Sequence, residues 1–270
     1  MVVAVKEETV LKRAKKHRHL IEAEWPLHHF TVEEYHRIGE IELFQTEGHV
    51  ELLGGLIIWN TDRTDMDQVQ KATFLYTELP LRRFSLTEYQ ELIAAGLLAE
   101  DEQLELIDGL ILEMSPINPK HAACLDALSE ILTIKLYKQA KIRVQSPIAL
   151  ELHSSQPQPD LTIAKLRPDG YWQQHPRENE ILLILEVSDS TLEKDRDEKL
   201  DLYAQASVPE YWIANLVDEQ IEVYRDPMLS ATGKAIYKTK ITYMHGQTLA
   251  PLKFPECVIA VDEVMPKAKN

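Results

Sequence analysis

The stretch Ile181-Leu-Leu-Ile-Leu-Glu-Val187 decides the fold of this chain. Its apolar residues occupy consecutive positions, which predicts a central strand covered by helices on both faces of a sheet. Glu186 is the one ionisable residue in this run. Burying an uncompensated carboxylate costs several kcal/mol, so Glu186 needs a partner. Two partners fit: a divalent cation shared with a second acid, or a local donor at the end of the strand.

The segments around this strand predict a mixed sheet. Upstream, residues 121–138 have apolar side chains at helical spacing, and residues 141–152 alternate until Pro147 interrupts them, as on a kinked or edge strand. Downstream, Ser190 and Glu193 form an S-x-x-E capping box, which predicts a helix continuing to about Ala206. Further strands are expected at 160–164, 211–216, 221–225, 235–243 and 253–261. This order predicts an α/β (α+β) fold, with a mixed central β-sheet flanked by helices.

A half-repeat occupies the N-terminal part of the chain. Residues 30–57 are similar to residues 84–111, with nine of 28 aligned positions identical. Each copy predicts a short helix with a capping box, followed by a hairpin with Gly55 or Gly109 in its turn. The expected capping pairs are Thr31 with Glu34, and Ser85 with Glu88. Two copies indicate a local duplication and not a solenoid.

Composition indicates a globular cytoplasmic protein. Hydrophobic residues make up 44% of the 270 residues, enough for a packed core. No apolar run approaches the roughly 18 residues that a membrane span needs, and the N-terminus fits no signal peptide. Cys124 and Cys257 are the only cysteines, so the sequence shows no zinc motif or disulfide framework. We therefore expect a soluble protein of the reducing cytoplasm, with no membrane partner.

The charge balance is strongly acidic. A net charge of −15 argues against a surface that binds DNA over its whole extent, because phosphate binding depends on Lys and Arg. Two stretches are locally basic, Lys12–His19 and the set from Lys135 to Arg143. Each has two interpretations: part of a basic channel, or a solvated face that compensates nearby acids.

Asp160 and Glu186 are the candidate catalytic pair. Asp160 begins one expected strand and Glu186 ends another, so neighbouring strands would bring both carboxylates to one edge of the sheet. Lys199 lies about two turns into the following helix, and helical side chains lean toward the N-terminus, so it can reach back toward Glu186. The alternative interpretation of Lys199 is an exposed lysine that balances Asp195 and Glu198.

Several separated blocks resemble a known family. They are PDLTIAK from Pro159, ILLILEVSDST from Ile181 and KLDLYAQASVPEYWIANL from Lys199, preceded by FSLTEY, ELIDG, EMSP and His121. Over about residues 82–263, the chain resembles the Uma-type endonucleases, a bacterial branch of the restriction-endonuclease-like superfamily. That superfamily has the signature PD-(D/E)xK. Here Ser188 stands in place of the signature lysine, and Lys199 on the next helix is the matching position.

The resemblance implies a restriction-endonuclease-like core and a metal-dependent endonuclease that hydrolyses DNA phosphodiester bonds. Asp160, Glu186 and the backbone carbonyl of Val187 would bind Mg²⁺ or Mn²⁺. A water acidified by the ion would attack the phosphodiester. Lys199 would orient that water or stabilise negative charge on the phosphate. Ser188 shares a strand face with Glu186 and would form a hydrogen bond within the site.

The family pattern also includes His121 and Glu113. Either would act in or next to the site, whereas a histidine at a helix start is often a cap or a packing residue, and Glu130 is an alternative acid from the same helix. Tyr211 and Trp212 could stack on bases, but their place in an apolar strand favours packing in the core. Trp172, in a Gly-containing loop, is the better candidate for substrate contact.

The sequence leaves alternatives for the function. A degenerate nuclease fold could bind nucleic acid or a protein partner without cutting, which the lysine missing at Ser188 and the acidic charge favour. A hydrolase using paired acids as general acid and base lacks any substrate-binding signature. The expected domains are an N-terminal extension, residues 1–80, and a nuclease domain, residues 81–266. A cut in both DNA strands needs two sites, which is compatible with a homodimer, although the sequence identifies no interface.

Overall fold

The computed structural model describes residues 27–41, 50–53, 55–59, 81–99, 102–231 and 233–266. They divide into two compact units on either side of the Ser115–Pro116 boundary. Both copies of the half-repeat belong to the first unit. The proposed division into residues 1–80 and 81–266 stays a prediction.

The first unit confirms the helix-and-hairpin prediction in both copies. Helix α2 (Val32–Glu40) precedes hairpin β1–β2 (Val50–Leu53, Leu56–Trp59), and α4 (Leu86–Ala94) precedes β3–β4 (Leu104–Ile107, Leu110–Glu113). Both predicted capping boxes form: the N-cap hydroxyls of Thr31 and Ser85 each accept a hydrogen bond from the backbone N–H of the glutamate three residues later. The turn glycines adopt left-handed φ values of 88° at Gly55 and 77° at Gly109, where a side chain would be strained.

A residue that precedes each copy pairs with the hairpin of the other copy. Leu27 forms a β-bridge with Leu112 of the second hairpin, and Leu81 forms the corresponding bridge with Ile58 of the first. Because each copy supplies an edge to the other's hairpin, the duplication builds one shared apolar core. That core includes Phe30 and Ile38 from the first copy, and Phe84 and Leu92 from the second.

The second unit is built on one mixed sheet of six strands. Its order is β10-β9-β8-β7-β6-β5, and all neighbours are antiparallel except the parallel pair β7–β8. The strands are β5 (Lys141–Val144), β6 (Leu161–Ala164), β7 (Ile181–Ser188), β8 (Glu210–Asn215), β9 (Gln220–Leu229) and β10 (Ala235–Tyr243). Strand β7 is central and buried, as its apolar run predicts, and β5 is an edge strand that ends before Pro147.

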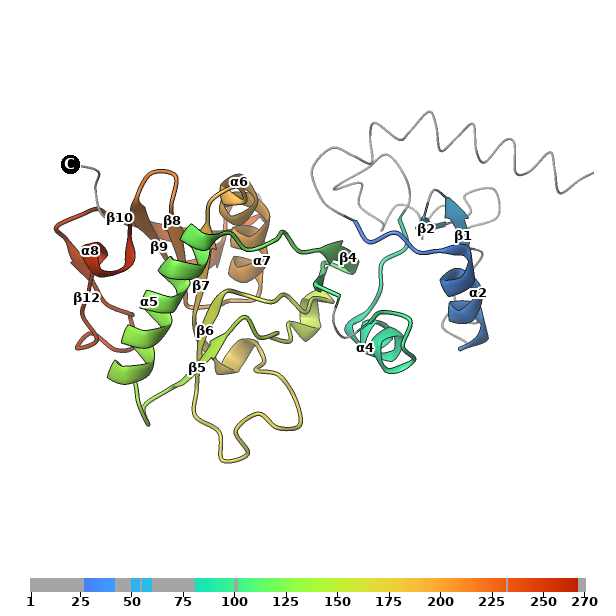
Figure 1. Cartoon of the computed structure of the whole chain (residues 1–270), viewed down its shortest axis with the longest axis horizontal. Helices are drawn as coiled ribbons and strands as arrows, with labels where there is room; N and C mark the ends of the chain where they lie inside the picture. Colours follow the sequence, from blue (N-terminus) through green and yellow to red (C-terminus); the bar gives the residue numbers. More distant parts are fainter. Residues whose placement is uncertain are drawn as a thin grey trace, which may run out of the picture. The chain divides into compact units, whose positions relative to one another are not determined.

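Helices cover both faces of this sheet (Figure 1). Helix α5 (Pro119–Lys135) and the short α8 (Val261–Val264) pack on the face that carries Leu183, Leu185 and Val187 of β7. On the other face, α7 (Leu200–Gln205) contacts β9 and β10. Because side chains alternate along a strand, Glu186 and Ser188 project toward this second face.

The helix after β7 differs from its prediction. It consists of α6 (Leu192–Lys194), a π-helical turn at Asp195–Lys199 and α7. We call Asp195–Lys199 the π-turn. The expected Ser190 cap is wrong: the N-cap residue is Thr191, without a side-chain capping bond. The physical reason is that the hydroxyl of Thr191 donates instead to the buried carboxylate of Asp195.

One predicted strand is also largely wrong. Within residues 253–261 only Ile259–Ala260 forms a strand, β12, and it pairs with β11 (Thr248–Leu249) outside the main sheet. Proline and charged residues interrupt this segment, and its last apolar residue, Val261, begins α8 instead. Short 3-10 turns occupy Glu151–His153 and Glu178–Glu180. In the described part of the chain, every helix is too short or too polar to cross a membrane. The basic stretch Lys12–His19 lies outside the described residues.

Candidate active site

Asp160 lies immediately before β6, where the antiparallel register places it beside the end of β7. Leu161 pairs with Leu185, so the next residues outward are Asp160 and Glu186. The backbone N–H of Asp160 donates to Oε2 of Glu186 at 3.3 Å. Oδ2 of Asp160 accepts the N–H of Val187 at 2.8 Å. The two carboxylates predicted from the sequence are therefore neighbours at one edge of the strand pair.

Glu186 is buried between the sheet and the helix that follows β7. Its side chain is 3% exposed. Oε1 accepts hydrogen bonds from Nζ of Lys199 at 3.0 Å and from the hydroxyl of Tyr203 at 2.8 Å. Burial raises the pKa of Glu186 to about 8, against the opposing effect of the Lys199 ammonium. The Lys199 ammonium therefore does not fully compensate the cost of burying the negative charge of Glu186.

Lys199 occupies the position that the sequence assigns to it. Lys199 is only 8% exposed, so the alternative interpretation, an exposed lysine that balances nearby acids, is wrong. The ammonium lies 3.0 Å from Oε1 of Glu186 and 3.7 Å from Oδ1 of Asp195. The helix after β7 therefore places a positive charge beside Glu186.

Ser188 contributes to the site through Asp195. Its hydroxyl donates to Oδ2 of Asp195 at 2.7 Å, and the hydroxyl of Thr191 donates to the same oxygen at 2.8 Å. Ser188 thus forms a hydrogen bond on the face of the sheet that carries Glu186, as expected, and its partner is Asp195. These contacts join Ser188, Asp195, Lys199 and Glu186 into one buried polar network.

His121, on the first turn of α5, contacts Asp160. Its Nε2 lies 2.9 Å from Oδ2 of Asp160, and this hydrogen bond raises the pKa of His121. Asn118 is the cap of the same helix: its Oδ1 accepts the N–H groups of Lys120 and His121, and its amide donates to Asp189 at 3.0 Å. The capping interaction thus orients the helix start that carries His121 toward Asp160.

The other candidate residues have different surroundings. Glu113 ends β4 of the first unit with an exposed side chain, and its role stays a prediction. Glu130 is exposed on α5 and makes no hydrogen bond or ion pair with the described site residues. Tyr211 and Trp212 are fully buried, which confirms the packing interpretation. Trp172 is 92% exposed, but its loop joins the ends of β6 and β7 opposite those that carry Asp160 and Glu186.

Two residues of the site are missing from the sequence-based set. Tyr203 contacts Glu186 and Asp195 contacts Lys199, yet neither residue is among the site residues predicted from the sequence. Their spacing was the available signal: Asp195, Lys199 and Tyr203 recur every fourth residue, which places polar groups on one helical face directed at the sheet.

The donor set fits a divalent cation in its chemistry. Each carboxylate oxygen has two lone pairs, so Oδ2 of Asp160 and Oε1 of Glu186 are filled by their two donors, while Oε2 of Glu186 accepts one bond. Oδ1 of Asp160 accepts none from the described residues. Mg²⁺ commonly uses one or two carboxylates and keeps several waters. Among the described residues, no group of three His, Cys, Asp or Glu side chains is placed to hold a metal.

Solved structures show the class of this fold. The chain is similar to a crystal structure from Anabaena variabilis ATCC 29413, described as that of "a putative nuclease belonging to DUF820". The TM-score is 0.50 at 12% sequence identity, over 67% of this chain and 97% of that one. At this identity the likeness shows a shared fold alone.

The family follows from the sequence match. Residues 86–262 match the Uma2 family, described as "Putative restriction endonuclease". This match covers more than half of the chain, and the chain belongs to that family. It confirms the resemblance seen in the sequence blocks. No curated protein matches the chain.

Proposed function

We propose that the chain is a Mg²⁺- or Mn²⁺-dependent endonuclease that hydrolyses DNA phosphodiester bonds at Asp160, Glu186 and Lys199. The observation that carries the proposal is the convergence of these three residues. They come from three elements, and each is within hydrogen-bond distance of a neighbour in the set. Membership of a restriction-endonuclease family and a fold shared with a nuclease-class protein support it.

Asp160 and Glu186 would hold the ion through the oxygens that retain accepting capacity. The backbone carbonyl oxygen of Val187 would be the third protein ligand of the ion. Its N–H bonds to Asp160, and in a strand the N–H and C=O of one residue project to the same edge. A divalent ion, when bound, lowers the pKa of water and neutralises negative charge on a phosphate.

The protein side chains have separate tasks in this proposal. Lys199 places a fixed positive charge beside Glu186, where it would stabilise charge that develops on the phosphate. His121 holds the carboxylate of Asp160 in one orientation through Oδ2. Tyr203 holds Glu186 in the same way through Oε1. These bonds fix both carboxylates before substrate arrives, which lowers the reorganisation needed during the reaction.

A second function is favoured by one specific observation. Lys199 and Tyr203 already occupy Oε1 of Glu186, and burial raises the pKa of this acid to about 8. A protonated Glu186 would bind a cation poorly. A protein with this site would bind nucleic acid or a protein partner without cutting it.

A cleavage assay separates the two functions. Purified protein is incubated with supercoiled plasmid and with single-stranded DNA at pH 8.5, where Glu186 is largely ionised. Parallel reactions contain Mg²⁺, Mn²⁺ or EDTA. The endonuclease proposal expects cleavage with the ions, none with EDTA, and loss of cleavage in Asp160→Asn.

The matched control is Asp126→Asn. Asp126 is an exposed aspartate on α5, so this variant loses the same charge away from the site. It should cleave like the parent protein. DNA binding without cleavage by the parent, with either ion, would favour the binding function. Equal cleavage by parent and Asp160→Asn would mean that another site or a contaminant is responsible.

A further inference from the structure

The π-turn is anchored to three adjacent strands. The side chain of Asp195 accepts the hydroxyl of Ser188 on β7, and the carbonyl of Asp195 accepts the hydroxyl of Tyr211 on β8 at 3.1 Å. The next residue, Arg196, forms an ion pair with Glu222 on β9. Neighbouring residues of one turn are thus fixed to β7, β8 and β9.

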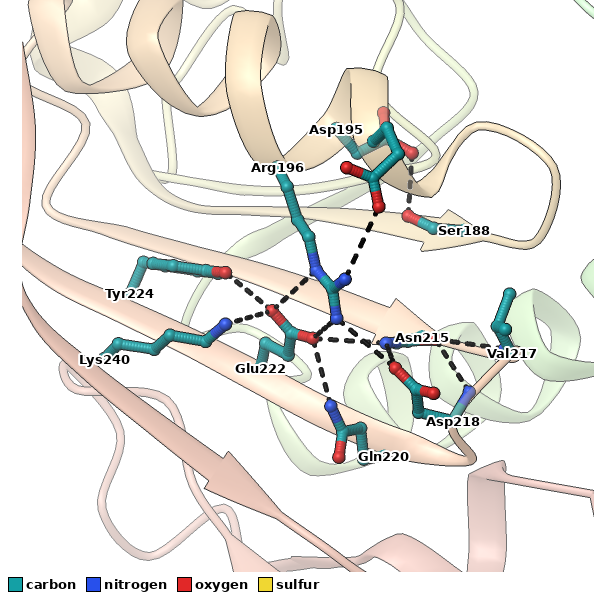
Figure 2. Close-up of polar contacts among 11 residues, drawn as sticks. Ser188, Asp195, Arg196, Asn215, Val217, Asp218, Gln220, Glu222, Tyr224 and Lys240 are labelled. Atoms are coloured by element: carbon teal, nitrogen blue, oxygen red, sulfur yellow. Dashed lines mark hydrogen bonds and ion pairs between the residues drawn. The ribbon is translucent and has the colours of Figure 1, made fainter.

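Glu222 makes the outer anchor strong. Glu222 is fully buried, and besides Arg196 it forms an ion pair with Nζ of Lys240 at 2.7 Å. Its carboxylate also accepts hydrogen bonds from the hydroxyl of Tyr224 at 2.6 Å and from the side-chain amide of Asn215 at 3.1 Å. Figure 2 shows Arg196, Lys240, Tyr224 and Asn215 converging on Glu222. In the same view Asp195, the first residue of the π-turn, is joined to Ser188. A buried charge with this many donors has one favoured arrangement, so Arg196 is held in place.

The turn has a direct consequence for Lys199. Side chains four residues apart along a helix lie on the same face. Here Asp195 and Lys199 share one face, with Oδ1 of Asp195 3.7 Å from the ammonium, and Lys199 and Tyr203 both reach Oε1 of Glu186. Asp195 is itself buried, 2% exposed, so its attraction for the ammonium is weakly screened.

We propose that Asp195 is the positioning residue for Lys199: fixed by Ser188 and Thr191, its carboxylate holds the ammonium on Glu186. This rests on the proposed nuclease function for its effect on cleavage, but the position of Lys199 can be measured without activity. Asp195 touches neither substrate nor ion in this scheme. It acts through Lys199 alone.

The test compares Asp195→Asn with Asp197→Asn. Asp197 lies on the same π-turn with an exposed side chain, so its variant removes the same charge from the turn without touching Lys199. Asparagine at 195 keeps the shape and can still accept the hydroxyls of Ser188 and Thr191. It therefore removes the negative charge beside the ammonium while preserving the anchor.

The first readout is the ¹H–¹⁵N spectrum of the lysine ammonium groups, with the Lys199 signal assigned from its loss in Lys199→Met. A hydrogen-bonded, buried ammonium exchanges its protons slowly. Asp195→Asn should shift this signal and speed its exchange, and Asp197→Asn should leave it in place. An unchanged Lys199 signal in Asp195→Asn would overturn the proposal, whether or not the protein cuts DNA.

The second readout is kinetic. In the cleavage assay, Asp195→Asn should lower kcat by roughly 10- to 100-fold, the usual effect of removing a group that orients a site residue, with KM changed less than about twofold. In the Lys199→Met background the same change should have little further effect, because its target is gone. Full additivity of the two substitutions would show a merely structural role. A shifted ammonium signal in a protein without any cleavage would instead retain Asp195 as positioning residue and reject the nuclease function.

Discussion

Lys199 and Glu186 form a buried ion pair at the centre of the site, with Nζ of Lys199 3.0 Å from Oε1 of Glu186. The two residues come from the helix and the central strand of the second unit. A buried pair of this kind is not in itself a stabilising element, because the desolvation of both charges offsets their attraction. Under the proposed function, this pair places a positive charge next to Asp160.

The first prediction concerns the charge of Lys199. Lys199→Met removes the ammonium and keeps the length of the side chain, so cleavage should fall by roughly 10²- to 10³-fold, as when a preorganised electrostatic group is lost. Initial rates of plasmid nicking at saturating Mn²⁺ measure this. Lys165→Met removes an exposed lysine beyond the opposite end of β6 and should cut normally. A Lys199→Met protein as active as its control would remove Lys199 from the mechanism.

The second prediction separates stability from function at Tyr203. Tyr203→Phe deletes one donor to the buried Glu186 and should reduce the free energy of unfolding by about 1–2 kcal/mol, measured by urea denaturation. Tyr237→Phe deletes an equally buried hydrogen bond, from its hydroxyl to the carbonyl of Val208, and should destabilise similarly. Only Tyr203→Phe should also slow cleavage. Equal cleavage by both variants would limit Tyr203 to a packing role.

The third prediction concerns pH and Glu222. Burial alone would raise the pKa of Glu222, but hydrogen bonds from Arg196, Lys240, Tyr224 and Asn215 together outweigh it and hold this pKa well below its ordinary value of 4.5. A lowered pKa in the folded state stabilises the protein above pH 4.5, and this contribution is lost as pH falls toward the folded pKa.

Glu222→Gln should therefore destabilise the protein at pH 7 by about 3 kcal/mol, since it leaves Arg196 beside a neutral group. The difference from the parent should shrink steadily below pH 4.5. Urea unfolding at pH 7, 5, 4 and 3 measures it. A difference that grows on acidification would show that Glu222 is protonated in the folded protein.

The fourth prediction concerns the turns of the repeated unit. At Gly109, with φ of 77°, an added Cβ would lie 2.7 Å from Cβ of Arg83 and 3.0 Å from the carbonyl oxygen of Phe84. Gly96 has a similar φ of 64° but no atom within 4 Å of an added Cβ. Both alanine variants carry the left-handed backbone cost of about 1 kcal/mol.

Gly109→Ala should exceed Gly96→Ala in destabilisation, because the backbone of Phe84 must also move. Hydrogen exchange of the first unit measures the two losses locally. Equal losses would mean that the backbone of Arg83 and Phe84 shifts freely to accommodate the added methyl group.

Much of the fold follows from the sequence because its signals are local. The apolar run of β7 and the half-repeat with its capping residues depend on neighbouring residues, and the structure confirms them. The segment from Lys253 to Val261 shows the limit. Its apolar residues fill gaps between other elements, and only long-range packing determines that two of them pair with β11.

The site was predictable in its carboxylates but not in its supporting network. Asp160 and Glu186 stand at strand ends, where the antiparallel register alone brings them together. Asp195 and Tyr203 lie at every-fourth-residue spacing with Lys199, but this spacing alone does not say which side chains of the sheet they contact. The sequence predicts Ser190 as the helix cap, whereas the N-cap residue is Thr191, whose hydroxyl donates to the buried carboxylate of Asp195. Tertiary hydrogen bonds override the local capping signal there.

The most direct test of the central claim is Mn²⁺ binding to the parent protein and to Asp160→Asn, measured by calorimetry at pH 8.5. The account predicts one site in the parent that Asp160→Asn abolishes and Asp126→Asn retains. Binding should also weaken as pH falls below about 8, because Glu186 must lose its proton to bind the ion. Equal Mn²⁺ affinity in parent and Asp160→Asn would contradict the claim that Asp160 and Glu186 share a metal ion.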